Sequence, residues 1–440
     1  MRKKGTVSLL TCVAALSVFS APDAWAACGG TVRTWGGASS VAWNTNANWV
    51  LANAPNTAAE DAVIVSAARV PNSSTSRTVG CVDVQSGSLN TTNLVTLTVM
   101  GDYFRNLTVG GLNVPAARTW TVLMAGTANQ TLENVDPVNY INITNNNTVT
   151  FSNAFTLRNT LTMAGTSTIL RIDADLNMQN AAAFTIPANN TVEVGNGVTW
   201  TVAISITVDG TLHIKAGGKL KLVAGATITV SGAGLLKLEG ASGNIATLEG
   251  NGGAIGVSVA GSVFGNYFRM DRLNASGLNV TGTIQTLSNG EFHYLANTGS
   301  AVTLGAAATV PATWDSLGFF DDSAFGNCTN INAAAFNVSN IQVNNWSGMG
   351  AANENDPSGR VNWGTGAGTK LSVSNNTVAG SPPATINQAT GPSLFATFAF
   401  ALTQADVATD ITALTFTLDG TGTAGDVQYI QVFSDTSANC

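Results

Sequence analysis

The chain has 440 residues, of which 45% are hydrophobic and only 10% are charged, and its formal net charge at pH 7 is −7. An acidic balance disfavours nucleic acid as a partner, and the length suits one elongated repeat domain with an appended module better than one ordinary domain. The low charge does not indicate disorder, because the apolar residues are regularly spaced between Gly and Asn at turn positions.

Residues 1–26 predict a signal peptide. Basic residues at 2–4 precede the apolar run VSLLTCVAALSVFSA, and Ala24–Ala26 supplies an A-x-A cleavage site. We therefore expect an exported protein, secreted or at the cell surface. Lipidation at Cys28 is an alternative, although Trp25 occupies the place where a lipoprotein signal carries Leu or a similar small aliphatic residue. No later stretch has the roughly 20 uninterrupted apolar residues of a membrane helix, so no transmembrane helix is expected.

Four cysteines, Cys28, Cys81, Cys328 and Cys440, follow the leader and would enter an oxidising compartment. Their spacing fits no zinc pattern, and no metal or other cofactor is expected. We predict a disulfide between Cys28 and Cys81, because both lie in the irregular N-terminal segment, where a bond that closes a long loop stabilises most. Four unpaired, buried thiols are the alternative.

Residues 27–93 are predicted to form an N-terminal cap and the first strands. Their opening, TWGGASSVAWNTNANWVLANAPNTAAEDAVIV, resembles the beginning of secreted bacterial parallel β-helix surface proteins, including autotransporter-passenger-like proteins. The residues that carry the resemblance are Trp35, Trp43, Asn48, Trp49, Pro55, Asp61 and the strand Ala62–Val65. The resemblance implies an architecture and no particular activity. We interpret the tryptophans as a cover for the open end of the first coil rather than as a sugar-stacking platform.

Residues 94–364 predict a right-handed, three-sided parallel β-helix. In TLHIKAGGKLKLVAGATITVSGAGLLKLEG (211–240), apolar pairs recur every eight residues around one polar residue, as in short strands with one buried face. ITVDG at 206–210 returns 22 residues later as ITVSG, so a coil of 22 to 24 residues is expected, with on the order of eleven coils. This alternation places Leu220 inward and Thr229 outward. An array of β-sandwiches is the alternative, but it would not give so constant a spacing.

The β-helix is predicted to end at DPSGRVNWG (356–364), where Val361 and Trp363 would place apolar side chains over the last coil. Residues 365–390 have the Gly, Ser, Pro and Asn content of a linker. Residues 391–440 alternate like a sandwich hairpin and resemble the first half of an immunoglobulin-like bacterial surface domain. Because this partial β-sandwich has too few strands to close, we expect a longer parent protein.

Titratable groups are sparse, and no motif of a serine hydrolase, zinc protease or P-loop enzyme is visible. One of the two histidines, His213, projects outward from its predicted strand. Two acidic pairs, Asp173 with Asp175 and Asp321 with Asp322, are interpreted as solvated groups, although the first pair shares one face of a strand, as carboxylates do in polysaccharide-cleaving β-helices.

One group of residues forms the candidate ligand site. NYFRMDRLN and GEFHYLAN are offset by 22 residues, which would place Arg269 beside Glu291 and Asp271 beside His293 on the outer face. The two interpretations are exposed ion pairs across coils, each contributing about 0 to 1 kcal/mol, and a polar patch that grips an acidic or neutral glycan, with Arg269 donating paired hydrogen bonds. The alternation places Tyr294 inward.

The sequence therefore favours an exported, non-enzymatic surface or structural protein, with a β-helical stalk that serves adhesion or cell-envelope structure. Its partners would be extracellular polysaccharide or other cell-surface components. The alternative is a polysaccharide lyase or glycoside hydrolase on the same scaffold. An enzyme would gather three or more carboxylates or basic residues on one sheet face within a groove, whereas the outer surface is predicted to carry mainly Thr, Ser and Asn.

Overall fold

A computed structural model describes residues 28–50, 53–65, 71–85, 90–91, 95–105, 121–133, 137–179, 183–321, 327–364, 371–376 and 397–402. The chain divides into two units, Met1–Gly368 and Thr369–Cys440. The first unit is a parallel β-solenoid of about 12 turns, which confirms the fold class that the sequence predicts. The predicted signal peptide lies outside the described residues.

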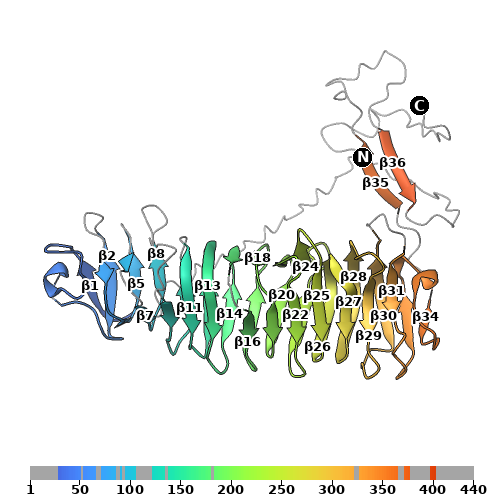
Figure 1. Cartoon of the computed structure of the whole chain (residues 1–440). Coiled ribbons are helices and arrows are strands. Elements are labelled where there is room, and N and C mark those ends of the chain that lie inside the picture. Colours follow the sequence, from blue (N-terminus) through green and yellow to red (C-terminus); the bar gives the residue numbers. More distant parts are fainter. Residues whose placement is uncertain are drawn as a thin grey trace, which may run out of the picture. The chain divides into compact units, whose positions relative to one another are not determined.

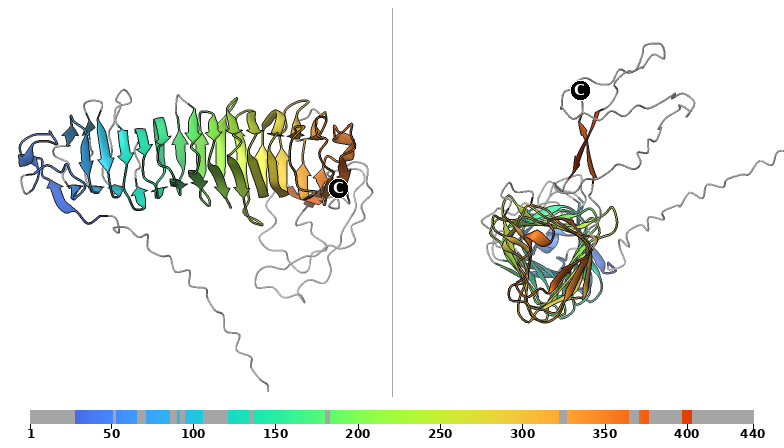
Figure 2. Two further views of the ribbon diagram at one scale, coloured as in Figure 1. Left: turned by 90° about the horizontal axis from the view of Figure 1, so that it is seen from below. Right: turned by 90° about the vertical axis from the view of Figure 1, so that its right-hand side faces the viewer.

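Three sides make up each complete coil, and successive coils follow one another along the axis (Figures 1 and 2). The first side contains β1 (Thr31–Trp35), β2 (Glu60–Ile64), β5 (Val82–Val84), β8 (Tyr103–Arg105), β10 (Gln130–Leu132), β12 (Thr148–Phe151), β14 (Ile169–Ile172), β17 (Thr191–Val194), β20 (Thr211–Lys215), β23 (Leu235–Glu239), β32 (Ile341–Asn344) and β34 (Val361–Trp363). The second side contains β3 (Asn72–Ser73), β6 (Asn90–Thr91), β15 (Leu176–Met178), β18 (Thr199–Val202), β21 (Lys219–Val223), β24 (Ala246–Asn251) and β33 (Ser347–Gly348).

The third side contains β4 (Arg77–Val79), β7 (Thr96–Val99), β9 (Thr121–Met124), β16 (Phe184–Ile186), β19 (Ile206–Val208), β22 (Thr227–Val230), β25 (Ile255–Val259), β27 (Leu273–Val280), β29 (Ser300–Leu304) and β31 (Thr329–Asn332). Five longer strands turn a corner. Two run from the second side to the third, β11 (Val138–Ile143) and β13 (Phe155–Met163), and three run from the first to the second, β26 (Ser262–Asp271), β28 (Thr283–His293) and β30 (Thr313–Phe319).

The pairing register confirms the predicted coil length. Ile206 of β19 pairs with Ile228 of β22, which is the 22-residue offset read from the two ITV phrases. The coil length varies elsewhere, with 20 residues between the aligned Thr191 and Thr211 and 24 between Leu212 and Leu236. Parallel pairing begins at β1 with β2, so the stretch expected to form a cap and first strands already contributes strands to the first coils.

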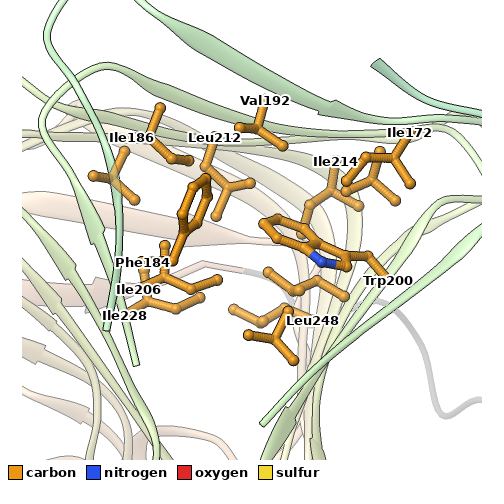
Figure 3. Packing of buried hydrophobic residues seen from close by; sticks show 14 of the residues in the cluster. Ile172, Phe184, Ile186, Val192, Trp200, Ile206, Leu212, Ile214, Ile228 and Leu248 are labelled. Atoms are coloured by element: carbon orange, nitrogen blue, oxygen red, sulfur yellow. The ribbon is translucent and has the colours of Figure 1, made fainter. Parts of the chain in front are cut away.

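A single apolar core fills the solenoid along its length. Each inward residue stacks on its counterpart in the next coil, as Trp200, Leu220 and Leu248 do on the second side. All three side chains are 0% exposed. Figure 3 shows aliphatic and aromatic side chains of several successive coils meeting in the interior of the solenoid. The stack continues along the described part of the solenoid, so each coil between the two ends packs against two neighbours.

Buried polar side chains line the corner between the third and first sides. Gln130, Asn145, Thr168 and Asn190 are each at most 1% exposed. The Asn190 side chain donates to the carbonyl of Gly165 at 2.8 Å and accepts from the backbone N–H of Thr168 at 2.8 Å. The Asn145 amide donates to Gln130 Oε1 at 2.8 Å. The Asn190 bonds satisfy backbone groups that the turning chain would otherwise leave unpaired, and all of these bonds join one coil to the next.

Three tryptophans cover the first coil. Trp35, Trp43 and Trp49 are at most 3% exposed, and the Trp49 ring meets the other two edge-to-face at centroid distances of 5.1 and 4.8 Å. The indole N–H of Trp49 donates to the Trp43 carbonyl at 2.6 Å, and that of Trp43 to the Pro55 carbonyl at 3.2 Å. Because the rings are buried and their polar atoms bonded, they serve as a cover and offer no open stacking surface to a sugar.

A disulfide joins Cys28 to Cys81 at the same end, with 5.6 Å between the two Cα atoms. The Asp61 carboxylate accepts hydrogen bonds from the backbone N–H groups of Gly30 and Cys81, at 2.9 and 2.7 Å. These bonds fix the backbone at or next to each of the two bonded cysteines. Cys328 is buried. Cys440 lies outside the described residues. The alternative of four unpaired thiols is therefore wrong.

The other end of the solenoid is closed by β34, which pairs with β32. Val361 is 6% exposed, and Trp363 packs against the core, as the alternation in DPSGRVNWG predicts. The Trp363 ring meets those of Trp346 and Phe319 edge-to-face, with centroid distances of 5.3 and 6.1 Å. Aromatic rings therefore cover both ends of the core.

In the second unit, the structure describes one antiparallel pair, β35 (Leu371–Asn376) with β36 (Thr397–Leu402). β35 falls within the stretch predicted as a linker, and most of the predicted immunoglobulin-like module lies outside the described residues. Across the described parts of the chain, no helix has the length and apolar character needed to span a bilayer.

Candidate functional site

The four candidate residues lie on the outer face of the second side, on the C-terminal halves of β26 and β28. Each strand turns its corner at a residue in the left-handed conformation, Tyr267 and Asn289, both with φ of 49°. The adjacent side chains of Asn266 and Tyr267 both lie outside the core. After them Phe268 and Met270 point inward, and Arg269 and Asp271 point outward. The left-handed residue thus resets the alternation so that the candidate side chains face solvent.

A glycine is required where these two strands cross the corner. Gly290 pairs with Phe268, and a Cβ built on Gly290 would lie 2.0 Å from the Phe268 ring. The close approach lets Phe268 and Phe292 pack edge-to-face, with 5.6 Å between centroids. This packing fixes the backbone on which the outward residues stand.

The register of the candidate residues is the one that the 22-residue offset predicts. Arg269 pairs with Glu291 and Asp271 with His293, while Met270 lies against Phe292 in the core. The bonded partners differ from the prediction, because Arg269 Nε donates to both oxygens of Asp271, at 2.8 and 2.9 Å, and not to Glu291. His293 Nε2 lies 3.2 Å from Glu291 Oε2.

The reason is geometric. An outward residue has a neighbour about 4.8 Å away on the next coil and another about 6.6 Å away, two residues along its own strand. The long Arg269 side chain reaches the second. Asp271 is only 7% exposed, so a bonded cation offsets the cost of burying its carboxylate.

Arg269 stays charged in this setting. Burial alone would lower its pKa, but the hydrogen bond to Asp271 and the charges of Asp271 and Glu291 outweigh burial, and the pKa of Arg269 is raised above its ordinary value. Its Nε–H is committed to Asp271, so paired hydrogen bonds to a glycan would have to come from the two Nη groups alone.

The same face carries further charged residues towards the N-terminus. Lys221, Glu249, Asp271 and His293 occupy one row in successive coils. Glu249 Oε1 lies 2.8 Å from Lys221 Nζ, and its Oε2 lies 3.6 Å from Lys219 Nζ. Three carboxylates, those of Glu249, Asp271 and Glu291, therefore lie on one face in three successive coils. This part of the outer surface is richer in charge than the predicted Thr, Ser and Asn.

Tyr294 faces solvent, and the prediction that it points inward is wrong. It is 41% exposed and has a φ of 50°. The position one coil earlier, Arg272, is also exposed and has a φ of 58°. The left-handed conformation turns both side chains out of the alternation, and Leu273 and Leu295 fill the core after them. The Arg272 guanidinium lies 4.9 Å from the centroid of the Tyr294 ring.

Phe320 is a part of this region that sequence reasoning missed. It follows the buried Phe319, and its ring stacks on His293 with 4.6 Å between centroids and 24° between planes. The FF pair was a usable signal, because two adjacent residues of a strand cannot both point inward. Arg272 carried a similar signal, since simple alternation would have buried an arginine.

His213 lies in a second charged group, on the outer face of the first side. Its Nε2 is 3.0 Å from Glu239 Oε2, and its Nδ1 is 3.9 Å from Glu193 Oε1. Burial and the charge of Lys237 lower the pKa of His213 more than the two carboxylates raise it, which favours the neutral imidazole. Burial alone would raise the pKa of Glu193, but hydrogen bonds from Lys215 and Arg171 leave it lowered. This group joins four coils through ion pairs.

Of the two predicted acidic pairs, Asp173 and Asp175 lie in the described part of the chain, where each has its own surroundings. Asp173 is exposed as a residue, but its carboxyl group is partly buried, which raises its pKa, while the charges of Arg171 and Lys215 oppose the rise. Asp175 accepts a hydrogen bond from the backbone N–H of Thr199 at 2.7 Å, which is the role of a turn residue. Asp322 lies outside the described residues.

No group of three His, Cys, Asp or Glu residues in the described ranges is placed to hold a metal ion. The chain matches no protein-family model, no curated protein and no solved structure. The parallel β-solenoid itself is therefore the part of the predicted resemblance that stands.

Proposed function

We propose that the protein is an exported, non-enzymatic surface scaffold. The solenoid would serve as a stalk in adhesion or cell-envelope structure and would meet extracellular polysaccharide or other cell-surface components. The observation that supports this role best is the single core cluster that the described residues form between the Trp35 end and the Trp363 end, with aromatic rings at both ends. A rod of this kind holds its shape without a partner and presents a long outer surface.

The charged residues on the outer face of the second side support the same proposal. A general acid or base needs a titratable group free to exchange a proton with the substrate. Glu249 pairs with Lys221, Asp271 with Arg269, and Glu291 with His293. The first pair links two successive coils, and the other two pairs each join neighbours on one strand. In all three the charge of the carboxylate is already balanced, which suits a structural role.

A polysaccharide lyase or glycoside hydrolase is the second candidate function. The observation in its favour is the row of three carboxylates on one face, with Arg269, Lys219 and Lys221 among them. In the scaffold proposal the cations neutralise these carboxylates. In the enzyme proposal the same cations would bind an acidic sugar.

Export is tested by fusing residues 1–30 to an alkaline phosphatase that lacks its own leader, in a bacterial host. We expect high phosphatase activity, because that enzyme needs disulfides that form only outside the reducing cytoplasm. Leu9→Arg with Leu10→Arg, which interrupts the apolar run, should abolish the activity. Activity of the intact fusion no higher than that of leaderless phosphatase would contradict the proposal.

A further inference from the structure

Arg272 and Tyr294 occupy the corner between the second and third sides in successive coils, where β26 and β28 end. Both side chains are exposed, and Tyr294 is the one aromatic residue among the exposed large hydrophobic side chains of the described ranges. The guanidinium carbon lies 4.9 Å from the Tyr294 ring centroid, which is a cation–π contact.

The conformation of both residues is costly. A left-handed backbone is cheap for Gly and tolerable for Asn, but it strains a residue with a large side chain by about 1 to 2 kcal/mol. Other corners of the solenoid use glycine for such conformations, as at Gly217 and Gly225 with φ of 70° and 80°. Arg272 and Tyr294 hold this strained conformation at equivalent positions of neighbouring coils, although Asn would adopt it at a lower cost. The strain therefore indicates that their side chains have a role of their own.

The Arg272 guanidinium lies over the Tyr294 ring. Where a guanidinium stacks parallel to a ring, the N–H groups at its edge stay free. Within the part of the chain that the structure describes, the Tyr294 ring is the only group with which the charged Arg272 guanidinium interacts. Such a preorganised fork matches a carboxylate, which can accept two parallel hydrogen bonds.

The two carboxylates on β26 and β28 that precede Arg272 and Tyr294 already have partners. Asp271 is bonded to Arg269, and Glu291 to His293, whose ring is packed on Phe320. The chain as a whole is acidic, with a net charge of −7, so it does not attract polyanions through its overall charge. Binding of an acidic ligand would therefore depend on this local cation.

We propose that Arg272 and Tyr294 form a binding site for a carboxylated polysaccharide, one that contains uronic acid residues. Arg272 donates paired hydrogen bonds to a sugar carboxylate, and Tyr294 is the positioning residue that holds the guanidinium over its ring. The proposal rests on the proposed function, since it names the polysaccharide class and the site. In this proposal the ligand contacts Arg272 in place of Arg269, whose Nε–H is bonded to Asp271.

The test is a titration of the full chain with alginate oligosaccharides, followed by calorimetry. We expect Arg272→Asn to weaken binding by about tenfold or more, the effect of losing charge-assisted hydrogen bonds. Tyr294→Asn should weaken it several-fold, while Tyr294→Phe, which keeps the ring, should restore binding. Asn accepts the left-handed conformation, so both Asn variants should melt no lower than the wild type.

Two controls make the result specific. Alginate esterified with propylene glycol lacks free carboxylates and should bind at least tenfold more weakly than alginate. Thr298→Asn alters another exposed left-handed residue, with φ of 55°, and should leave binding unchanged. The proposal is overturned if the wild type does not bind alginate, if the ester binds equally well, or if Arg272→Asn retains full affinity. A failed titration leaves the outcome of the phosphatase fusion untouched, so the two proposals fail separately.

Discussion

Replacing Leu220 by Asp is expected to prevent the solenoid from folding. Leu220 is 0% exposed and lies between Trp200 and Leu248 in the inward stack of the second side. A carboxylate there has no cation within the core, and burying it costs several kcal/mol, which is a large part of the stability of an ordinary domain. Circular dichroism should show loss of the β-sheet signal or a strongly lowered melting temperature.

The matched control is Thr229→Asp. Thr229 is on the outer face of β22, between Thr207 and Ser258 in the neighbouring coils, and its side chain is exposed. A solvated carboxylate at this position should change the free energy of unfolding by less than about 1 kcal/mol. If the two variants melt alike, the assignment of inward and outward residues is wrong.

Removing the disulfide should destabilise the N-terminal coils. Cys28 and Cys81 are 53 residues apart in sequence, and a loop of that length gives a stabilisation of about 4 kcal/mol in the chain-entropy model. Because a solenoid transmits stability mainly between neighbouring coils, the loss should be largest where Trp35, Trp43 and Trp49 pack. Tryptophan fluorescence should therefore report an early transition in Cys28→Ser with Cys81→Ser.

A reductant provides the control for the disulfide. It should lower the melting temperature of the wild type towards that of the double variant, and it should leave the double variant itself unchanged. Equal melting curves for oxidised wild type and double variant would show that the bond does not hold the first coils together.

The regular part of the fold was predictable because one physical requirement repeats. Every coil must bury one face, so the inward pair recurs and the offset from Ile206 to Ile228 gives the coil length. The same logic placed Asp271 opposite His293. It worked because backbone pairing, which the apolar pattern fixes, decides which residues are neighbours.

Side-chain partners and corners were less predictable. The register alone could not say that Arg269 would bond along its strand to Asp271, since this depends on side-chain length and burial. The prediction placed Tyr294 inward because simple alternation does not allow for a left-handed residue, which reverses the inward–outward order. Arginine and tyrosine rarely adopt this conformation, so their residue types did not predict it at positions 272 and 294. The buried corner residue Asn190 looks in sequence like any turn asparagine, and only its bonds to Gly165 and Thr168 identify its role.

The central proposal is that the charged residues on the outer face of the second side are structural and perform no chemistry. The direct measurement is incubation of the purified chain with a panel of acidic and neutral polysaccharides, followed by assay of reducing ends and of unsaturated ends. We expect neither product above the level of a protein-free control, for the wild type and for Asp271→Ala with His293→Ala alike. Release of either product by the wild type that disappears in the double variant would contradict the claim and make Arg269, Asp271, Glu291 and His293 the active site of a polysaccharide-cleaving enzyme.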